Sequence, residues 1–435
     1  MTLVYLFETY LDYRQYRKLQ DKQFPPPLKQ AIEALGADDD DDKTGHTTLL
    51  AATQAKFDTS RAYGVDRSVF GLVKAAYTQV EATALLVLGY WPLLWTVSGR
   101  ILVSMGLDPT NEISRALLLV TLTSVREMLV GLPFDVYATF VLEARHGFNQ
   151  QTFRLFIMDK LKQWMLLLVL GYPVLSVLLC VIRWGGPSFY MYGWAFLFVI
   201  SLLLITVYPV AILPLFNTFT PLAQGTLRSR IEALAAEVAF PLANIFVTDG
   251  SKRSRHSNAY LIGLFRTKRI VLYDTLVDQA TEDEIVAIVG HELGHWRLGH
   301  VLEAFGIQQA TILAYLYAFG WCMQNRELFC SFGFAGDVAT PVMIGGLLFS
   351  QTLWAPVDHV LTFLGTLATR RNEFAADAFA VDLGHERALQ SGLTKLAIEN
   401  LANMNPDALY STYHYSHPPL LERLDAIAAR GKKVR

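Results

Sequence analysis

The segment IVGHELGHWRLGH, residues 288–300, places two histidines and a glutamate within five positions. If the segment is helical, His291 and His295 lie one turn apart on one face, so both imidazoles can bind the same ion. Zinc would lower the pKa of a coordinated water to about 7, and Glu292 would take its proton as the water attacks a peptide carbonyl. This H-E-x-x-H spacing predicts a zinc-dependent peptidase, although the same pattern also occurs by chance in ordinary helices.

A helix is expected to carry these residues, because Thr281 and Glu284 form a capping-box pattern that starts it. Gly290 and Gly294 remove side chains from the neighbouring face of this helix. They would permit close approach of a substrate or, equally, tight packing against another helix.

A third ligand must come from elsewhere, because His300 and Glu303 do not lie beside the two histidines on such a helix. The segment RRNEFAADAFAVDLG offers Glu373 and Asp377, four residues apart on one helix face. We predict that Glu373 is the third ligand and that Asp377 accepts a hydrogen bond that fixes the tautomer of a ligating histidine. The alternative is that both carboxylates only pair with the arginines that precede them.

Residues 244–277 contain three short strand-like runs. Residues 257–263 could form the edge strand of a sheet, to which an extended substrate adds. A purely structural hairpin would explain the same pattern.

The segment YHYSHPPLLERLDAI places Pro418 where it can occupy the first turn of a helix, with His417 before it and Arg423 after it. We predict that His417 stabilises the oxyanion of the tetrahedral intermediate, while Arg423 helps to position it or the substrate. His414 is the competing candidate, and a solvated surface position is the plain alternative.

The composition indicates the class of protein that carries these residues. Of 435 residues, 52% are hydrophobic and 17% are charged, which is typical of a membrane protein. The formal net charge of −2 argues against a nucleic-acid partner, because neutralising phosphates requires a basic face. The three cysteines do not indicate a disulfide scaffold.

Apolar runs long enough to cross a bilayer recur along the chain. Two of them carry charged residues, which points to a hydrated interior. The alternative is that these charges lie near the membrane interfaces or pair with one another. The fourth run is too long for one crossing, so it is expected to include re-entrant or interfacial backbone in addition to one full crossing. The six predicted crossings are 71–95, 116–142, 163–182, 185–227, 304–325 and 338–357.

The distribution of basic residues predicts the orientation. Lysine and arginine dominate the connections before the first crossing and after the second, which places both connections in the cytosol. Alternation of the crossings then puts residues 228–303 and 365–435 together on the cytosolic side. A site shared between these two segments requires this arrangement.

The chain is expected to divide into five parts. The first, residues 1–69, should be a remnant helix followed by a solvated acidic loop, because FPPPL breaks helices and Asp38–Asp42 is a run of charge. The others are a helical bundle at 70–227, a zinc-protease part at 228–303, further membrane helices at 304–364, and the rest of the protease domain at 365–435.

Taken together, these residues make the chain similar to the type I CAAX prenyl endopeptidases, integral-membrane zinc metalloproteases of the gluzincin type. The resemblance runs from about Phe7 almost to the C-terminus, in blocks that include FETYLDYRQYRKL, VSGR, GFNQQT, SKRSRHSNAYLIGLFRTKRIVLYDTL, VGHELGHW, NEFAADAFA and YSHPPLLERL. It implies one zinc ion per chain, a general base, two further catalytic residues and an edge strand that pairs with the substrate backbone. The matching residues are the ligands His291, His295 and Glu373, the base Glu292, the pair His417 and Arg423, and the strand residues His256, Ser257, Asn258, Ala259 and Tyr260.

The resemblance also implies an α-helical polytopic membrane protein. Six to seven transmembrane helices would enclose a water-filled chamber, with a zincin-like α+β metalloprotease domain on the cytosolic side. The first helix of the family would end near Phe7, so only a remnant of it is expected. The implied substrates are proteins that end in a prenylated cysteine followed by three residues, which the enzyme removes. Membrane lipid would be the other partner.

The final residues KKVR resemble a dilysine retrieval signal, which favours the endoplasmic-reticulum membrane, or the inner nuclear membrane, with a cytosolic C-terminus. Two other functions remain open from the sequence. One is a membrane protease of general quality control that degrades misfolded or translocon-stalled membrane proteins. The other is a non-catalytic membrane scaffold, for which Glu292 would be dispensable.

Overall fold

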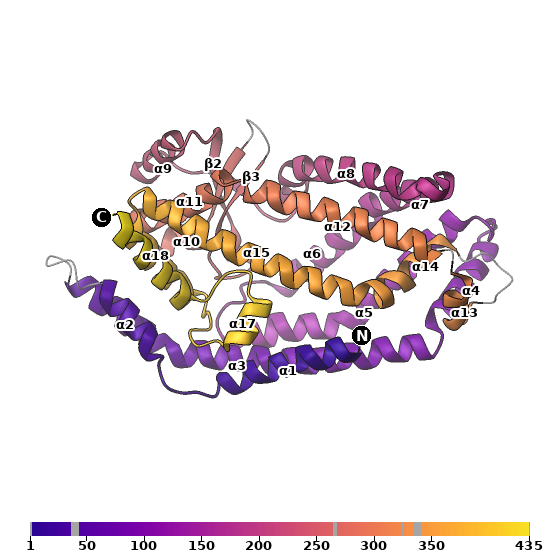
Figure 1. Ribbon diagram of the computed structural model, residues 1–435, viewed down its shortest axis with the longest axis horizontal. Helices are drawn as coiled ribbons and strands as arrows, with labels where there is room; N and C mark the ends of the chain where they lie inside the picture. The colour runs from indigo at the N-terminus through magenta and orange to yellow at the C-terminus, as the bar shows by residue number, and fades with distance from the viewer. Residues whose placement is uncertain (1, 36–42, 264–267, 324, 335–340, 435) are drawn as a thin grey trace.

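The computed structural model describes residues 2–35, 43–263, 268–323, 325–334 and 341–434. Long helices run along its longest axis, and a small sheet with shorter helices lies at one end (Figure 1). The bundle contains α1 Thr2–Lys18, α2 Pro26–Leu35, α3 Lys43–Val87, α4 Tyr90–Ser104, α5 Glu112–Tyr137, η1 Ala138–Glu143, α6 Phe153–Leu166, η2 Leu167–Gly171, α7 Tyr172–Trp184, η3 Gly186–Ser188, α8 Phe189–Val207, η4 Tyr208–Ile212, η5 Leu213–Leu215, α12 His300–Met323, α13 Arg326–Ser331, α14 Val342–Leu348, η7 Phe349–Trp354 and α15 Ala355–Asp382. The end part contains β1 Phe219–Pro221, α9 Thr226–Glu237, β2 Leu242–Thr248, η6 Gly250–Lys252, β3 Ala259–Ile262, β4 Lys268–Tyr273, α10 Asp274–Gln279, α11 Glu282–Arg297, α16 Glu386–Glu399, α17 Ala408–His414 and α18 Leu420–Val434.

The long helices make the chain a polytopic α-helical membrane protein. Three helical runs, 112–143, 153–184 and 186–215, are long and apolar enough to cross a membrane. A fourth is added if α3 and α4, which bend by 66° about the break between them, form one span. Helices also cover the two other predicted crossings as far as these are described, in α12 and in the run from α14 to α15.

The bundle is arranged as a ring rather than as a solid core. The main contacts follow the order α3, α4, α5, α7, α8, α12 and α14 to α15, and α1 and α17 close the ring between α15 and α3. Only 6% of the most apolar window in each of the three clear spans is buried. Charged side chains in the spans pair with each other: Arg126 binds Glu81, and Lys160 Nζ lies 2.6 Å from Asp135 Oδ2. These charges of the spans are therefore neutralised by one another.

The N-terminal region is helical, so the expectation of a flexible loop is wrong for its described residues. Helix α1 continues to Lys18 instead of ending near Phe7, and the prolines of FPPPL lead into α2, where proline is accepted in the first turn. Helix α2 and the adjoining part of α3 bury apolar side chains against the C-terminal part of the chain, which gives them a reason to fold. This cluster includes Leu28, Ile32, Leu35, Leu49, Phe57, Ile398, Met404 and Leu424. The acidic run at 38–42 lies outside the described residues.

The sheet has four strands in the order β1-β2-β4-β3. Strand β1 is antiparallel to β2, β2 is parallel to β4, and β3 is antiparallel to β4, so β3 forms an edge. Strand β1 lies within the predicted crossing 185–227, whose last part therefore joins the sheet and is not re-entrant. The sheet consequently begins before the predicted boundary at residue 228.

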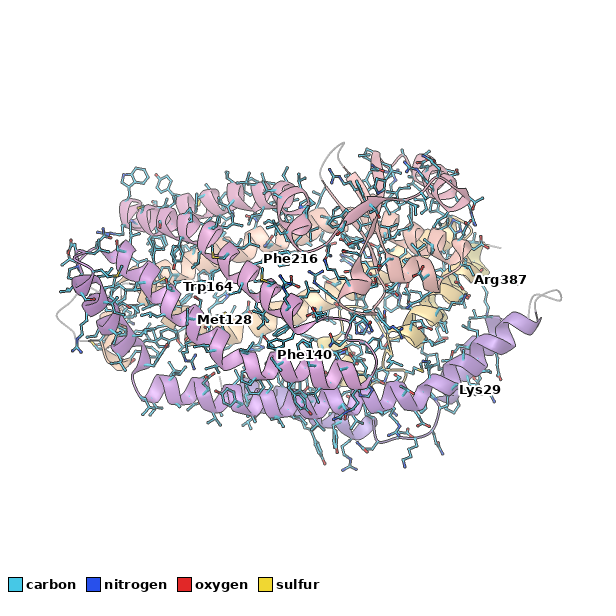
Figure 2. All side chains as sticks on the ribbon, turned by 180° about the vertical axis from the view of Figure 1, so that it is seen from behind. Lys29, Met128, Phe140, Trp164, Phe216 and Arg387 are labelled. Atoms are coloured by element: carbon cyan, nitrogen blue, oxygen red, sulfur yellow. The ribbon has the colours of Figure 1, made fainter. Side chains whose placement is uncertain are left out.

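The sheet packs on α9 and α11 through an apolar core that contains Ile245, Ile270, Leu272, Ile285 and Val289. This domain sits at one end of the bundle, together with α2, α16 and α18 (Figure 1). Lys29 of α2 and Arg387 of α16 lie at this end, whereas Met128 and Trp164 lie on neighbouring helices of the bundle (Figure 2). The segments 228–303 and 365–435 therefore meet at the same end of the molecule.

Candidate metal centre

Helix α11 begins where the sequence predicted. Thr281 N–H donates to Glu284 Oε2 at 2.8 Å, and Glu284 N–H donates to Thr281 Oγ1 at 3.4 Å, which completes a capping box. A Cβ added at Gly294 would lie 3.1 Å from the Cα and 3.2 Å from the carbonyl oxygen of Ala376. Gly294 therefore lets α11 pack closely on α15, which is the helix-packing explanation of this glycine.

The close packing brings three predicted ligands together. His291 Nε2 and His295 Nε2 lie 3.1 Å apart. Glu373 Oε1 lies 3.2 Å from His295 Nε2, and Glu373 Oε2 lies 3.6 Å from His291 Nε2. Ligands bound at 2.0–2.1 Å in a tetrahedral zinc site would be separated by about 3.3 Å, so the spacing of these atoms fits a single metal ion.

The two arginines before Glu373 have other partners. Arg370 Nη2 lies 2.6 Å from Glu422 Oε2, and Arg371 Nη2 lies 2.5 Å from Glu303 Oε1. The alternative in which Glu373 and Asp377 only pair with these arginines is therefore not what the structure shows.

We call His291, His295 and Glu373 the metal group. Asp377 and Arg423 contact it on the side of His291 Nδ1. His291 Nδ1 is 2.8 Å from Asp377 Oδ1, the contact predicted to fix its tautomer. Arg423 makes a bidentate contact with the same carboxylate. Its Nε donates to Oδ2 at 2.8 Å, and its Nη2 donates to Oδ1 at 2.6 Å. The arginine is buried and also lies 3.5 Å from Glu373 Oε2. Its guanidinium is thus held by the two carboxylates of α15.

These contacts decide the charge of the carboxylates. Burial by itself raises the pKa of Glu373, but hydrogen bonds from His295 and His417 and the charges of His291 and Arg423 hold that pKa well below its usual value. Burial also acts to raise the pKa of Asp377, and Arg423 and then His291 more than offset it, so the net shift is downward. Both groups are therefore ionised, as cation binding requires.

Glu292 follows the first histidine and faces the same group of charges. Burial raises its pKa, an effect that the nearby His291 and His295 oppose. A carboxylate whose pKa is raised from its ordinary value is better suited to accept a proton near neutral pH.

His417 approaches the metal group from the outside. Its Nδ1 lies 2.8 Å from Glu373 Oε2, and its side chain is 69% exposed. The hydrogen bond to Glu373 raises the pKa of His417. Helix α18 begins at Leu420, so Pro418 precedes the helix and does not occupy its first turn. The competing His414 packs on Tyr410 and Tyr413, with ring centroids 4.5 and 4.8 Å away.

The predicted edge strand is present as β3, and the runs on either side of it form β2 and β4. Tyr273 N–H donates to Asn258 O at 3.0 Å, and the register pairs Leu261 with Ile270. Because hydrogen-bonded and non-hydrogen-bonded pairs alternate in an antiparallel ladder, the backbone N–H and C=O of Leu261 point to the outer side of β3. Ala259 and Tyr260 lie on this strand, which packs near α11.

His256 and Ser257 precede the strand and attach it to other elements. The ring of His256 stacks on Phe148 with centroids 4.0 Å apart, and its Nε2 lies 3.6 Å from Glu143 Oε2. Ser257 N–H donates to Asn400 Oδ1 at 3.0 Å, and Asn400 Nδ2 donates back to Ser257 O at 3.2 Å.

The sequence did not predict that Glu143, Phe148 and Asn400 are partners of this segment. Its one relevant signal was the block GFNQQT, which contains Phe148. Helical spacing excluded His300 as a ligand but did not predict that its ring lies against that of His295.

Known proteins are similar to this chain over nearly its whole length. The family model "CAAX prenyl protease N-terminal, five membrane helices" matches residues 15–218, and the model "Peptidase family M48" matches residues 221–431. The "CAAX prenyl protease 1 homolog" of Arabidopsis thaliana is 45% identical over 100% of this chain and 97% of its own length. The Homo sapiens homolog is 38% identical over 98% and 93%, and "CAAX prenyl protease 1" of Saccharomyces cerevisiae is 37% identical over 97% and 92%. The crystal structure of S. mikatae Ste24p is similar with a TM-score of 0.86 and 36% identity, covering 98% of this chain and 96% of that one.

Proposed function

The chain belongs to peptidase family M48 and is a membrane metalloprotease, and from this premise we propose that it removes the C-terminal tripeptide of prenylated CAAX proteins at one zinc ion. The observation that carries the proposal is the convergence of His291, His295 and Glu373 within 4.8 Å of one another. Glu292 follows His291 on α11, and the edge strand β3 packs against this helix. The names of the relatives supply the substrate class, since they are similar over nearly the whole chain.

Each residue of the site has a role in this reaction. A zinc ion held by the three ligands would polarise the peptide carbonyl and activate a water molecule. Glu292 accepts the proton of the attacking water and returns it to the leaving amine. His417, exposed at the mouth of the site, donates a hydrogen bond to the oxyanion. The guanidinium of Arg423 donates two hydrogen bonds to Asp377. Arg423 therefore fixes the position of Asp377, and Asp377 in turn fixes the ring of His291.

Strand β3 provides the place for the substrate backbone. An extended peptide that adds to its outer edge would pair with Leu261, whose backbone groups face outward. Among the residues implied by the resemblance, Asn258, Ala259 and Tyr260 lie at or on the strand. His256 and Ser257 hold its beginning against the bundle and α16.

The prenyl chain would lie in the interior enclosed by the helices, and lipid would surround the apolar outer faces. We place the protein in the endoplasmic-reticulum membrane, or the inner nuclear membrane, with the metal site and C-terminus in the cytosol. Lys432 and Lys433 support this location because both are exposed at the end of α18, where a retrieval receptor can reach them.

The test is release of the tripeptide from a farnesylated peptide by the purified protein in detergent. Wild type should be active, chelator should abolish activity, and Glu292→Gln should lower kcat by about 10²- to 10⁴-fold while the zinc content stays unchanged. Equal release by wild type and Glu292→Gln would contradict the base assignment. Zinc-loaded wild type that cuts unmodified membrane proteins but not the prenylated peptide would favour a quality-control protease. A protein with no peptidase activity on either substrate would be the scaffold.

A further inference from the structure

The first turn of α12 lies directly against the second histidine of the metal group. Helix α11 ends at Arg297 and α12 begins at His300, with Gly299 between them at a φ of +75°. This left-handed conformation suits glycine and turns the chain sharply. His300 Nδ1 lies 2.9 Å from His295 Nδ1, and the two rings meet edge to face with centroids 5.0 Å apart.

The position of the metal group decides the direction of this hydrogen bond. His295 directs its Nε2 toward His291 Nε2 and Glu373, so Nε2 must carry the lone pair that binds a metal ion. A neutral imidazole then has its proton on Nδ1, which donates to His300 Nδ1. The reverse direction would require a proton on His295 Nε2 and would block metal binding.

A second residue of the same turn reaches the helix that carries Glu373. Glu303 accepts hydrogen bonds from Arg371 Nη2 at 2.5 Å and from Asn372 Nδ2 at 3.1 Å. Arg371 and Asn372 directly precede Glu373 on α15. The first turn of α12 therefore contacts both helices that carry ligands, α11 through His300 and α15 through Glu303.

We propose that His300 is a positioning residue that holds His295 in the metal-binding tautomer and ring orientation, while Glu303 holds α15 in register beside it. The inference rests on the proposed metal site. The two histidine ligands thus have different outer partners: a carboxylate backed by an arginine for His291, and an uncharged imidazole for His295. Removing such an outer partner typically costs 10- to 100-fold in metal affinity.

The experiment measures zinc affinity of the full-length protein in detergent, by competition with a chromophoric chelator. His300→Leu fills similar space without an acceptor and should weaken affinity about 10-fold. His300→Asn places its Oδ1 near the position of the lost Nδ1. This variant should therefore bind zinc with an affinity within about threefold of wild type. His359→Leu is the control, because His359 pairs with Glu8 in the bundle at 3.1 Å.

The outcomes separate this inference from the metal site itself. Glu373→Gln should lose most of the zinc affinity, and retention of wild-type affinity by this variant would contradict the metal site. If Glu373→Gln fails to bind but His300→Leu binds as tightly as wild type, only the role of His300 is overturned. Equal weakening by His300→Leu and His300→Asn would also overturn it, since it would mean that the acceptor atom is irrelevant.

Discussion

The carboxylates of Glu373 and Asp377, four residues apart on α15, lie next to the two ring nitrogens of His291. Glu373 lies on the metal side of His291, and Asp377 lies at its outer nitrogen. Arg423 reaches both carboxylates from α18, so it offsets the cost of burying two negative charges next to each other. Without this arginine, one carboxylate would be driven toward its protonated form and would bind a cation less well.

Glu284 is a buried carboxylate outside the metal group, at the start of α11. It accepts hydrogen bonds from Ser391 Oγ at 2.6 Å, Lys395 Nζ at 2.9 Å and Thr281 N at 2.8 Å. Burial acts to raise its pKa, but these three partners lower it below the ordinary value of 4.5. Because the folded pKa is the lower one, Glu284 stabilises the fold at pH values above about 4.5, and this stabilisation is lost as the pH falls through the folded pKa.

We expect Glu284→Gln to lower the free energy of unfolding at pH 7 by about 1.5–3 kcal/mol, since charge-assisted hydrogen bonds are lost. The difference in Tm between wild type and variant should shrink as the pH falls below about 4.5. Thermal melts of the detergent-solubilised protein between pH 7.5 and pH 3.5 measure it, with the exposed Glu399→Gln as control. A difference in Tm that stays constant with pH would show that the charge of Glu284 is not the cause.

At the level of elements, the metal group depends on how closely α11 and α15 pack. Gly294 packs against Ala376, and each of the three predicted ligands lies within one helical turn of one of these two residues. Gly290 lies on the same helix, but a Cβ there would meet other side chains only at 3.7–3.8 Å. Each of these two glycines directly precedes a histidine of α11, but only Gly294 packs tightly against the backbone of α15.

This difference predicts different effects of alanine. Gly294→Ala forces a Cβ within 3.1 Å of backbone atoms of α15, so it should separate the helices, lower stability by about 1–3 kcal/mol and weaken zinc affinity. Gly290→Ala should bind zinc as wild type does and gain up to about 1 kcal/mol from helix propensity. Zinc titration and thermal melts of both variants test this, and equal zinc affinity for the two would contradict the packing argument.

At the scale of the whole molecule, the membrane bundle and the sheet are joined by a partly buried ion pair. Arg253 Nε donates to Asp159 Oδ2 of α6 at 2.8 Å, and other nitrogens of the same guanidinium bind Asn217 Oδ1 at 2.7 Å and Phe216 O at 2.6 Å. A short bridge pairs Asn149 with Ser254 beside it. This joint lies just before the segment that enters β3, so the bundle sets the position of the edge strand.

We expect Asp159→Asn to remove the counter-charge of Arg253 and to destabilise the protein by about 1.5–3 kcal/mol, the range for hydrogen bonds to charged groups. KM for a prenylated peptide should rise, whereas zinc affinity should stay unchanged because no ligand lies on this joint. The control is Asp382→Asn, which breaks an exposed pair with Arg430 and should cost less than about 1 kcal/mol. An unchanged KM together with an unchanged Tm for Asp159→Asn would contradict the proposed coupling.

Local patterns in the sequence predicted the elements that depend on neighbouring residues. Spacings of four residues or fewer decide the capping box at Thr281, the pair His291 and His295 on one face, and the short strand-like run of β3. The long apolar runs predicted the membrane helices for the same reason, since each run is long enough to cross a bilayer by itself. Helical spacing alone left Glu373 open between a ligand and a surface ion pair. The predicted topology favoured the ligand, because it places Glu373 and His291 on the same side of the membrane, and the resemblance implied the same role.

The tertiary structure alone decided which distant groups meet. The acidic, proline-containing N-terminal region reads as a loop because the apolar partners of Leu28 and Phe57 lie near the other end of the chain. His300 is excluded as a ligand by helical spacing, yet the turn at Gly299 brings its ring against His295. In each case the deciding free energy comes from burial or hydrogen bonding between segments far apart in sequence, which no local periodicity records.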